Sequence, residues 1–153
     1  MELELRVNGE AVRAEIAPQL LLLDLLRDEL GLTGAKRSCD VQVCGACTVL
    51  LDGAPVSACT TLAYEARGRE VLTIEGLAGR EEFVPLERAF TEHAAVQCGF
   101  CTPGLLLTVK ALLDDNALGS EEAIRRNLAG NLCRCTGYKG ILEAVLDLAG
   151  AES

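Results

Sequence analysis

The stretch that decides the fold reads Cys39-Asp40-Val41-Gln42-Val43-Cys44-Gly45-Ala46-Cys47. Its cysteines have the spacing Cys-x4-Cys-x2-Cys, and the next cysteine, Cys59, follows after eleven further residues. This spacing is typical of a loop that directs three thiolates onto a two-iron, two-sulfide (2Fe–2S) centre, while the fourth thiolate arrives from elsewhere. Gly45 lies inside the loop, where a residue without a Cβ lets backbone N–H groups approach the sulfur atoms.

A predicted β-hairpin brings the fourth thiolate back to this loop. Asp52-Gly53 is flanked by two short apolar segments and is a strong signal for a two-residue turn. With that turn, Ala46 lies opposite Cys59 and Cys47 lies opposite Ala58. The spacing is that of plant-type ferredoxins. We therefore predict one 2Fe–2S centre with the thiolate ligands Cys39, Cys44, Cys47 and Cys59.

The remaining cysteines form a second group, Cys98, Cys101, Cys133 and Cys135. A structural zinc site is the ordinary interpretation of such a set, but a Cys-x-Cys pair is tighter than is typical for zinc. Each pair also precedes a predicted helix, and the partial positive charge of two helix N-termini favours an anionic thiolate-bound cluster. The residues alone leave zinc and iron–sulfur as equal alternatives for this group.

Composition excludes several function classes. The chain has 153 residues, 14 Lys and Arg against 23 Asp and Glu, and a formal net charge of -9. This charge argues against a nucleic-acid partner or an anionic membrane surface, and the longest apolar run, Leu20 to Leu23, argues against membrane insertion. Eight cysteines without a recognisable export signal favour metal-binding thiols in a cytoplasmic protein over four disulfides.

The first 76 residues have the pattern of a small mixed sheet with one helix packed on it. Asn8-Gly9 is a turn signal between two alternating segments, so Leu5 lies opposite Val12 and Leu3 opposite Ala14 in the predicted hairpin. The other elements expected here are a helix over residues 20–30, the hairpin around residues 52–53 and a strand over residues 70–75.

The rest of the chain has helical spacing. Residues 77–82, rich in Gly and charge, are predicted to be a linker, and residues 83–153 to be a bundle of about four helices. Ser120 is a candidate N-cap, with Glu121 and Glu122 in the first turn that follows. The helices are expected at residues 86–94, 103–113, 121–128 and 139–148.

Three segments, Cys39–Val49, Gln97–Gly104 and Asn131–Tyr138, resemble the iron–sulfur subunit of the xanthine oxidase family of molybdenum hydroxylases. The resemblance covers nearly the whole chain and includes all eight cysteines. It implies an α+β fold, with an N-terminal β-grasp, ferredoxin-like domain in residues 1–76 and a C-terminal four-helix bundle domain. It also implies one 2Fe–2S cluster in each domain, so that all eight cysteines are cluster ligands.

The resemblance further implies partners and a role. They are a molybdopterin-binding large subunit and an FAD-binding medium subunit, assembled as a dimer of heterotrimers. The chain is then a non-catalytic oxidoreductase subunit that relays electrons from the molybdopterin site toward FAD or another acceptor. Gln97 matches a residue that hydrogen-bonds the pterin, and Cys135 matches a cluster ligand close to the pterin. The alternatives are a stand-alone ferredoxin-type carrier with a structural zinc domain and a thiol-based redox or metal sensor.

The first cysteine loop departs from the family pattern. Ser38 stands where Gly is usual, and residues 41–43 occupy a stretch that is often richer in Gly. Because these positions are not ligands, we expect them to alter the backbone geometry and reduction potential of that centre, with ligation unchanged. No acid, base or nucleophile constellation marks the sequence, so we expect no catalytic residue in this chain.

Overall fold

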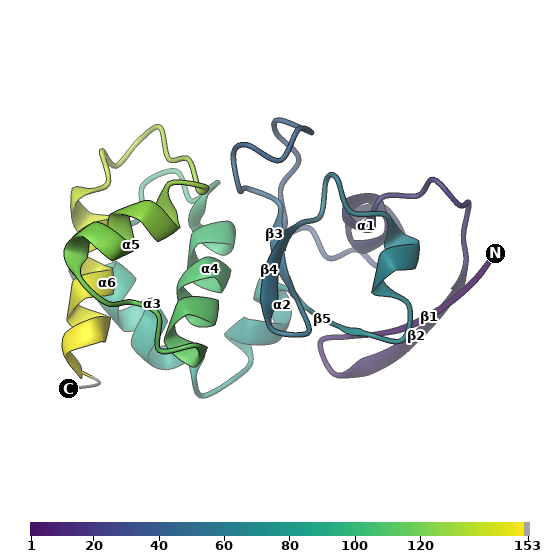
Figure 1. Cartoon of the computed structure of the whole chain (residues 1–153), viewed down its shortest axis with the longest axis horizontal. Helices are drawn as coiled ribbons and strands as arrows, with labels where there is room; N and C mark the ends of the chain where they lie inside the picture. Colours follow the sequence, from purple (N-terminus) through teal and green to yellow (C-terminus); the bar gives the residue numbers. More distant parts are fainter. Residues whose placement is uncertain (152–153) are drawn as a thin grey trace.

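The computed structural model describes residues 1–151, so positions 152–153 of the predicted helical domain lie outside the described residues. The strands lie toward one end of the molecule and helices α3 to α6 toward the other (Figure 1). The five-stranded sheet has the order β2-β1-β5-β3-β4. Its strands are β1 (Glu2–Val7), β2 (Glu10–Glu15), β3 (Thr48–Leu51), β4 (Ala54–Ser57) and β5 (Glu70–Leu72).

Both predicted hairpins have the predicted register. In the first, Leu5 pairs with Val12 and Leu3 with Ala14. In the second, β3 and β4 are antiparallel and Val49 pairs with Val56, as a turn at residues 52–53 requires. Both turn residues of each hairpin have positive φ, 54° and 85° in the first and 49° and 85° in the second. These values suit the right-handed twist of the flanking strands.

The mixed character of the sheet comes from β5, which is parallel to β1 and antiparallel to β3. The strand predicted over residues 70–75 is too long, because β5 ends at Leu72 and a short helix, α2 (Ile74–Ala78), follows. Thr73 separates the two elements, and its backbone N–H donates to Asn8 Oδ1 across 2.9 Å instead of continuing the ladder. Residues 77 and 78 of the predicted linker are therefore helical.

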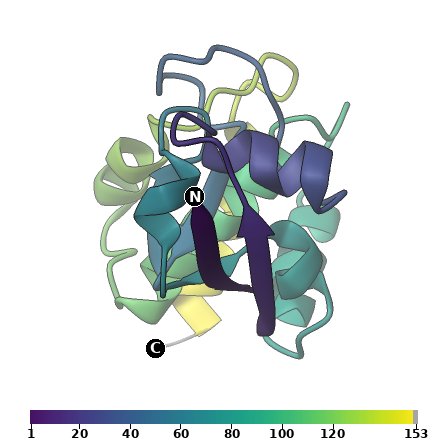
Figure 2. The same cartoon turned by 90° about the vertical axis from the view of Figure 1, so that its right-hand side faces the viewer.

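The helix predicted over residues 20–30 begins later and is less regular. It consists of α1 (Leu22–Asp24) and a π-helical turn, η1 (Leu25–Glu29). Its start is delayed because the Leu22 N–H donates to Thr61 O, 2.8 Å away, ahead of the short 3-10 helix η2 (Ala63–Ala66). One face of this helix packs into the core, where Leu22, Leu25 and Leu26 are fully buried. Figure 2 shows this helix beside the β1–β2 hairpin.

The second half contains α3 (Phe83–Glu92), α4 (Thr102–Asp114), α5 (Glu121–Leu128) and α6 (Lys139–Ala151). These helices share one core, to which each contributes side chains, among them Leu86, Phe90, Leu105, Leu107, Ile124, Ile141 and Val145. Ser120 is the N-cap of α5, because its side-chain oxygen accepts the Ala123 N–H across 3.3 Å. No helix within residues 1–151 is long and apolar enough to cross a membrane.

The sheet is covered on both faces where the two halves meet. Val49 and Leu51 of β3 belong to the core beneath α1, whereas Leu50 belongs to the core of the helical half. β3 is therefore buried along its whole length, with α4 packed against it. This packing places the loop before β3 beside the start of α4.

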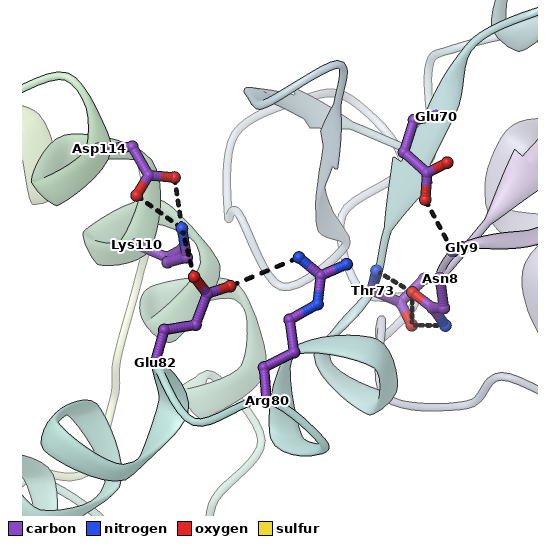
Figure 3. Close-up of polar contacts among 8 residues, drawn as sticks. All are labelled: Asn8, Gly9, Glu70, Thr73, Arg80, Glu82, Lys110 and Asp114. Atoms are coloured by element: carbon purple, nitrogen blue, oxygen red, sulfur yellow. Dashed lines mark hydrogen bonds and ion pairs between the residues drawn. The ribbon is translucent and has the colours of Figure 1, made fainter.

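Polar contacts also connect the two halves through the segment that follows β5 (Figure 3). At one end, the Asn8 side chain bonds both the backbone and the hydroxyl of Thr73. At the other end, Lys110 of α4 is buried and forms ion pairs with Glu82, 3.5 Å away, and with Asp114. Arg80 pairs with Glu82 at 3.4 Å within the segment itself, and the contacts of Thr73 and Glu82 hold its two ends.

Candidate metal centres

The first cysteine group lies in and beside the loop that leads into β3. Cys39 and Cys44 belong to the loop, and their thiols are in contact. Cys47 directly precedes β3 and Cys59 follows β4, and their thiols form a second contacting pair. The hairpin register creates this second pair, because the Ala58 N–H donates to Cys47 O across 3.4 Å.

Backbone N–H groups surround the Cys39 sulfur. Those of Val43 and Cys44 donate to Cys39 Sγ, each across 3.4 Å. Hydrogen bonds from Val41, Cys44 and Val43 lower the pKa of the Cys39 thiol to about 6, because they stabilise the thiolate. Since the thiolate is the form that binds metal, this environment suits a ligand.

The conformation of this loop requires left-handed backbone at two residues that are not glycine, Asp40 with φ 55° and Gln42 with φ 58°. Such a conformation costs about 1–3 kcal/mol at a residue of this kind. Arg37 braces the loop, since it donates to Asp40 Oδ1 across 2.6 Å and also pairs with Asp24 of α1. The glycine-poor sequence of this loop is thus accommodated with strain and ion pairing.

The Cys47–Cys59 pair has the opposite environment. Burial raises the pKa of the Cys47 thiol to about 12, and the neighbouring Cys59 sulfur adds to this because two adjacent thiolates repel each other. A buried pair of thiols can ionise together only when a cation compensates both charges. The chemistry of this pair therefore fits ligation of a metal.

The second cysteine group gathers at the starts of two helices, as predicted. Cys98 and Cys101 precede α4, and Cys133 and Cys135 precede α6. The sulfur atoms of Cys98 and Cys135 are 3.5 Å apart, and the thiols of Cys101 and Cys133 are also in contact. The Thr136 hydroxyl donates to Cys133 Sγ across 3.1 Å.

The thiols of the second group differ in their environments. Burial raises the pKa of Cys101 to about 12, and contact with Cys133 reinforces the effect. The Phe100 N–H and the Cys135 thiol lower the pKa of Cys98, which is exposed. One pair thus faces solvent, while the other packs against the helical core.

Each group of four thiols therefore consists of two contacting pairs. Within residues 1–151, no group of three or more His, Cys, Asp or Glu side chains is arranged to hold a single metal ion, and all eight cysteines are free thiols. Pairs are the arrangement that a 2Fe–2S centre needs, because its four thiolates divide two to each iron. The donor set fits such a centre in both groups.

The surroundings of both groups are exposed and apolar. Val41 and Val43 lie in the first loop and are 64% and 57% exposed. Val96, Phe100 and Leu132 are exposed beside the second group. Gln97 is also exposed, next to Cys98. Both cysteine loops lie along the same edge of the molecule, the upper edge in Figures 1 and 2.

The two loops contact each other through residues that lie beside the cysteines in the sequence. The Leu132 N–H donates to Cys44 O across 2.8 Å. The Asn131 side chain is buried and its Nδ2 donates to Gly45 O across 3.3 Å. In the sequence, Asn131 stands out only because it lies two residues before Cys133. That position does not predict a contact with the first loop.

Comparisons with known proteins agree with this arrangement. A family model described as a 2Fe-2S iron-sulfur cluster binding domain matches residues 5–73, and one described as a 2Fe-2S binding domain matches residues 73–146. The second match includes Cys98, Cys101, Cys133 and Cys135, for which the residues alone had left zinc and iron–sulfur open.

Three relatives extend over nearly the whole chain. The nicotinate dehydrogenase small FeS subunit of Eubacterium barkeri is 48% identical over 94% of this chain and 91% of its own length. The 6-hydroxypseudooxynicotine dehydrogenase complex subunit beta of Paenarthrobacter nicotinovorans is 45% identical over 95% and 91%. The crystal structure of quinoline 2-oxidoreductase from Pseudomonas putida 86 superposes with a TM-score of 0.92 and 44% identity, over 99% of this chain and 94% of the matched chain.

These relatives are subunits of oxidoreductases, so they do not favour a stand-alone carrier. Their identity exceeds 40% over nearly their full lengths, and both cysteine groups fall within matched 2Fe–2S binding domains. The chain therefore belongs to the small iron–sulfur subunits of the xanthine dehydrogenase family of molybdenum hydroxylases, which serve electron transfer in oxidoreductase complexes.

Proposed function

We propose that this chain relays electrons from a molybdopterin site in a large partner subunit toward FAD in a medium partner subunit. The observation that carries the proposal is the presence of two sets of four thiols, each set built from two contacting pairs, on loops that touch each other. A 2Fe–2S centre bound in each set supplies one-electron oxidation and reduction. This chain's own residues bind, orient and shield the two centres.

The pairs suggest how the ligands divide. In a first centre, Cys39 and Cys44 would hold one iron and the buried pair of Cys47 and Cys59 would hold the other. In the second centre, the corresponding pairs are Cys98 with Cys135 and Cys101 with Cys133. This division follows the thiol contacts.

The proposed domains follow the same division. Residues 1–76 form a β-grasp, ferredoxin-like domain, residues 77–82 connect the halves, and residues 83–153 form a four-helix bundle domain. The sheet order, and the packing of α6 against both α3 and α5, support this division. The two matched family models, which meet at residue 73, also support it.

Partner binding is proposed along the edge that carries both cysteine loops. Exposed apolar side chains grouped around polar functional residues are a common feature of protein interfaces. Gln97 and Cys135 are exposed on this edge, and their exposure supports the proposal that they meet a pterin held by the large subunit. We propose a dimer of heterotrimers in the cytoplasm, where thiols stay reduced.

Metal analysis tests this function against the carrier alternative. The purified complex is expected to contain about four iron atoms, about four acid-labile sulfides and no zinc for each copy of this chain. A carrier with a structural zinc domain would contain about two iron atoms and one zinc. Two iron atoms and one zinc for each chain would show that the helical half does not carry electrons.

A further inference from the structure

Asn131 lies where the two cysteine loops meet, and it contacts both. Asn131 is 4% exposed. Its side-chain amide donates to Gly45 O across 3.3 Å and lies 3.5 Å from Thr48 Oγ1. Gly45 and Thr48 flank the stretch that contains Cys47. A buried amide without a partner is costly, so these contacts restrict the side chain to one placement.

The backbone around this amide is packed closely. A Cβ atom added to Gly45 would lie 2.3 Å from Gly130 O, and one added to Gly104 of α4 would lie 2.2 Å from Gly45 O. The Gly45 carbonyl also accepts the backbone N–H and the hydroxyl of Thr48. The first loop therefore cannot shift relative to Asn131 without losing several contacts.

The other end of Asn131 is tied to the second cysteine group through Tyr138. The Tyr138 hydroxyl donates to Asn131 O across 3.0 Å and accepts the Cys133 N–H across 2.8 Å. Tyr138 has φ 68°, a left-handed conformation that is unusual for an aromatic residue. One hydrogen-bonded chain thus runs from Cys133 through Tyr138 and Asn131 to Gly45, which follows Cys44 in the sequence.

We propose that Asn131 is a positioning residue that fixes the second cysteine loop against the first and so sets the relative placement of the two metal centres. Tyr138 orients Asn131 from the side of the second group. Electron exchange depends on the separation and orientation of the centres, so this residue controls the relay without touching either centre through a ligand bond. The inference rests on the proposed function, since it requires two centres in one chain.

Electron paramagnetic resonance of the fully reduced complex tests this role, because two nearby paramagnetic centres split each other's signals according to their separation. In Asn131→Leu, which keeps the number and branching of the side-chain heavy atoms and removes the amide donor, we expect both centres to load with iron. We expect the mutual splitting to change and the signal of the first centre to shift. In Tyr138→Phe, we expect the signal of the second centre to shift more than that of the first.

Asn127→Leu is the matched control. Asn127 also donates its amide to a backbone carbonyl, that of Ala117, but it is exposed and contacts neither cysteine loop. In Asn127→Leu, the mutual splitting and the paramagnetic signals of both centres are expected to equal those of the wild type. A role in packing alone would lower the thermal midpoint of Asn131→Leu without changing its spectrum.

If Asn131→Leu does not bind both centres, Asn131→Asp is measured at a pH where the carboxylate is ionised. An ionised carboxylate cannot donate to Gly45 O, so the splitting in Asn131→Asp should differ from that of the wild type while the shape of the residue is retained. An unchanged splitting in a fully loaded variant overturns the inference. A wild-type complex with one type of centre overturns the proposed function itself, so the two failures are distinguishable.

Discussion

Gly104→Ala should damage the first cysteine loop from the opposite half of the chain. Gly104 lies in the first turn of α4, and a Cβ there would stand 2.2 Å from Gly45 O. That carbonyl is backbone and already accepts bonds from Thr48 and Asn131, so it cannot move away without cost. Overpacking of this kind costs about 1–3 kcal/mol, which exceeds the modest helix preference for Ala over Gly in a first turn.

For a chain of this length, that loss corresponds to a fall of about 2–12 °C in the thermal midpoint. The assay is thermal unfolding of the iron-loaded complex, combined with the visible absorption and paramagnetic signal of the first centre. The thermal midpoint should fall and the signal of the first centre should change, while the signal of the second centre changes less. The displaced atoms belong to the loop of Cys39, Cys44 and Cys47.

Gly79→Ala is the control, because Gly79 has φ -83° and the nearest atom to an added Cβ is 3.9 Å away. At such a position Ala is expected to be neutral or to stabilise the protein by about 0.4–1 kcal/mol. If Gly104→Ala matches Gly79→Ala in midpoint and in spectrum, then the close contact between α4 and the first cysteine loop does not constrain the loop.

Three further outcomes are expected. Cys59→Ser should lose the first centre, and about half of the iron, while the second centre remains visible by paramagnetic resonance; equal loss of both would contradict independent ligand sets. In Cys101→Ser, substrate should still reduce molybdenum in a single turnover, but steady-state transfer to the flavin should collapse; sustained turnover without the second centre would rule out the relay. Asp52→Asn should reduce the loss of unfolding free energy at acid pH, measured by urea unfolding at a series of pH values. The Arg69 side chain and the Glu70 N–H hold the pKa of Asp52 below its usual value, so its contribution is complete above the unfolded-state pKa and is lost as the pH falls toward the folded-state pKa. Asn keeps the turn conformation, so an unchanged loss at acid pH would show that the ion pair contributes nothing.

The first cysteine loop combines a glycine-poor sequence with a left-handed backbone. The sequence has Gln42 in a stretch where the family is often richer in glycine, and the structure gives Gln42 a left-handed backbone. The same conformation directs the Val43 and Cys44 N–H groups at the Cys39 sulfur. Such N–H groups stabilise the more negative, reduced state of a thiolate-bound centre, so we expect this loop to raise the reduction potential of the first centre.

Local patterns in the sequence were sufficient for the features whose causes are local. The Asn8-Gly9 and Asp52-Gly53 turns determine both hairpin registers, because two-residue turns with positive φ leave one way for the flanking strands to pair. The Ser120 cap follows from the need of a helix N-terminus for an acceptor. The cysteine spacing was likewise enough to separate the eight thiols into two groups, because each set lies near turns or helix starts that bring it together.

The features that the sequence did not indicate are those that depend on contacts between residues far apart in the chain. β5 ends at Leu72 because Asn8, 65 positions away from Thr73, takes the Thr73 N–H. β3 is buried on both faces because α4 packs on the side opposite α1. The contact between Asn131 and Gly45 joins residues 86 positions apart. Periodicity and turn signals act over a few residues, so they determine the hairpins, the helix cap and the two thiol groups. The placement of one thiol group against the other was decided only when the apolar faces of the sheet and the helices packed together.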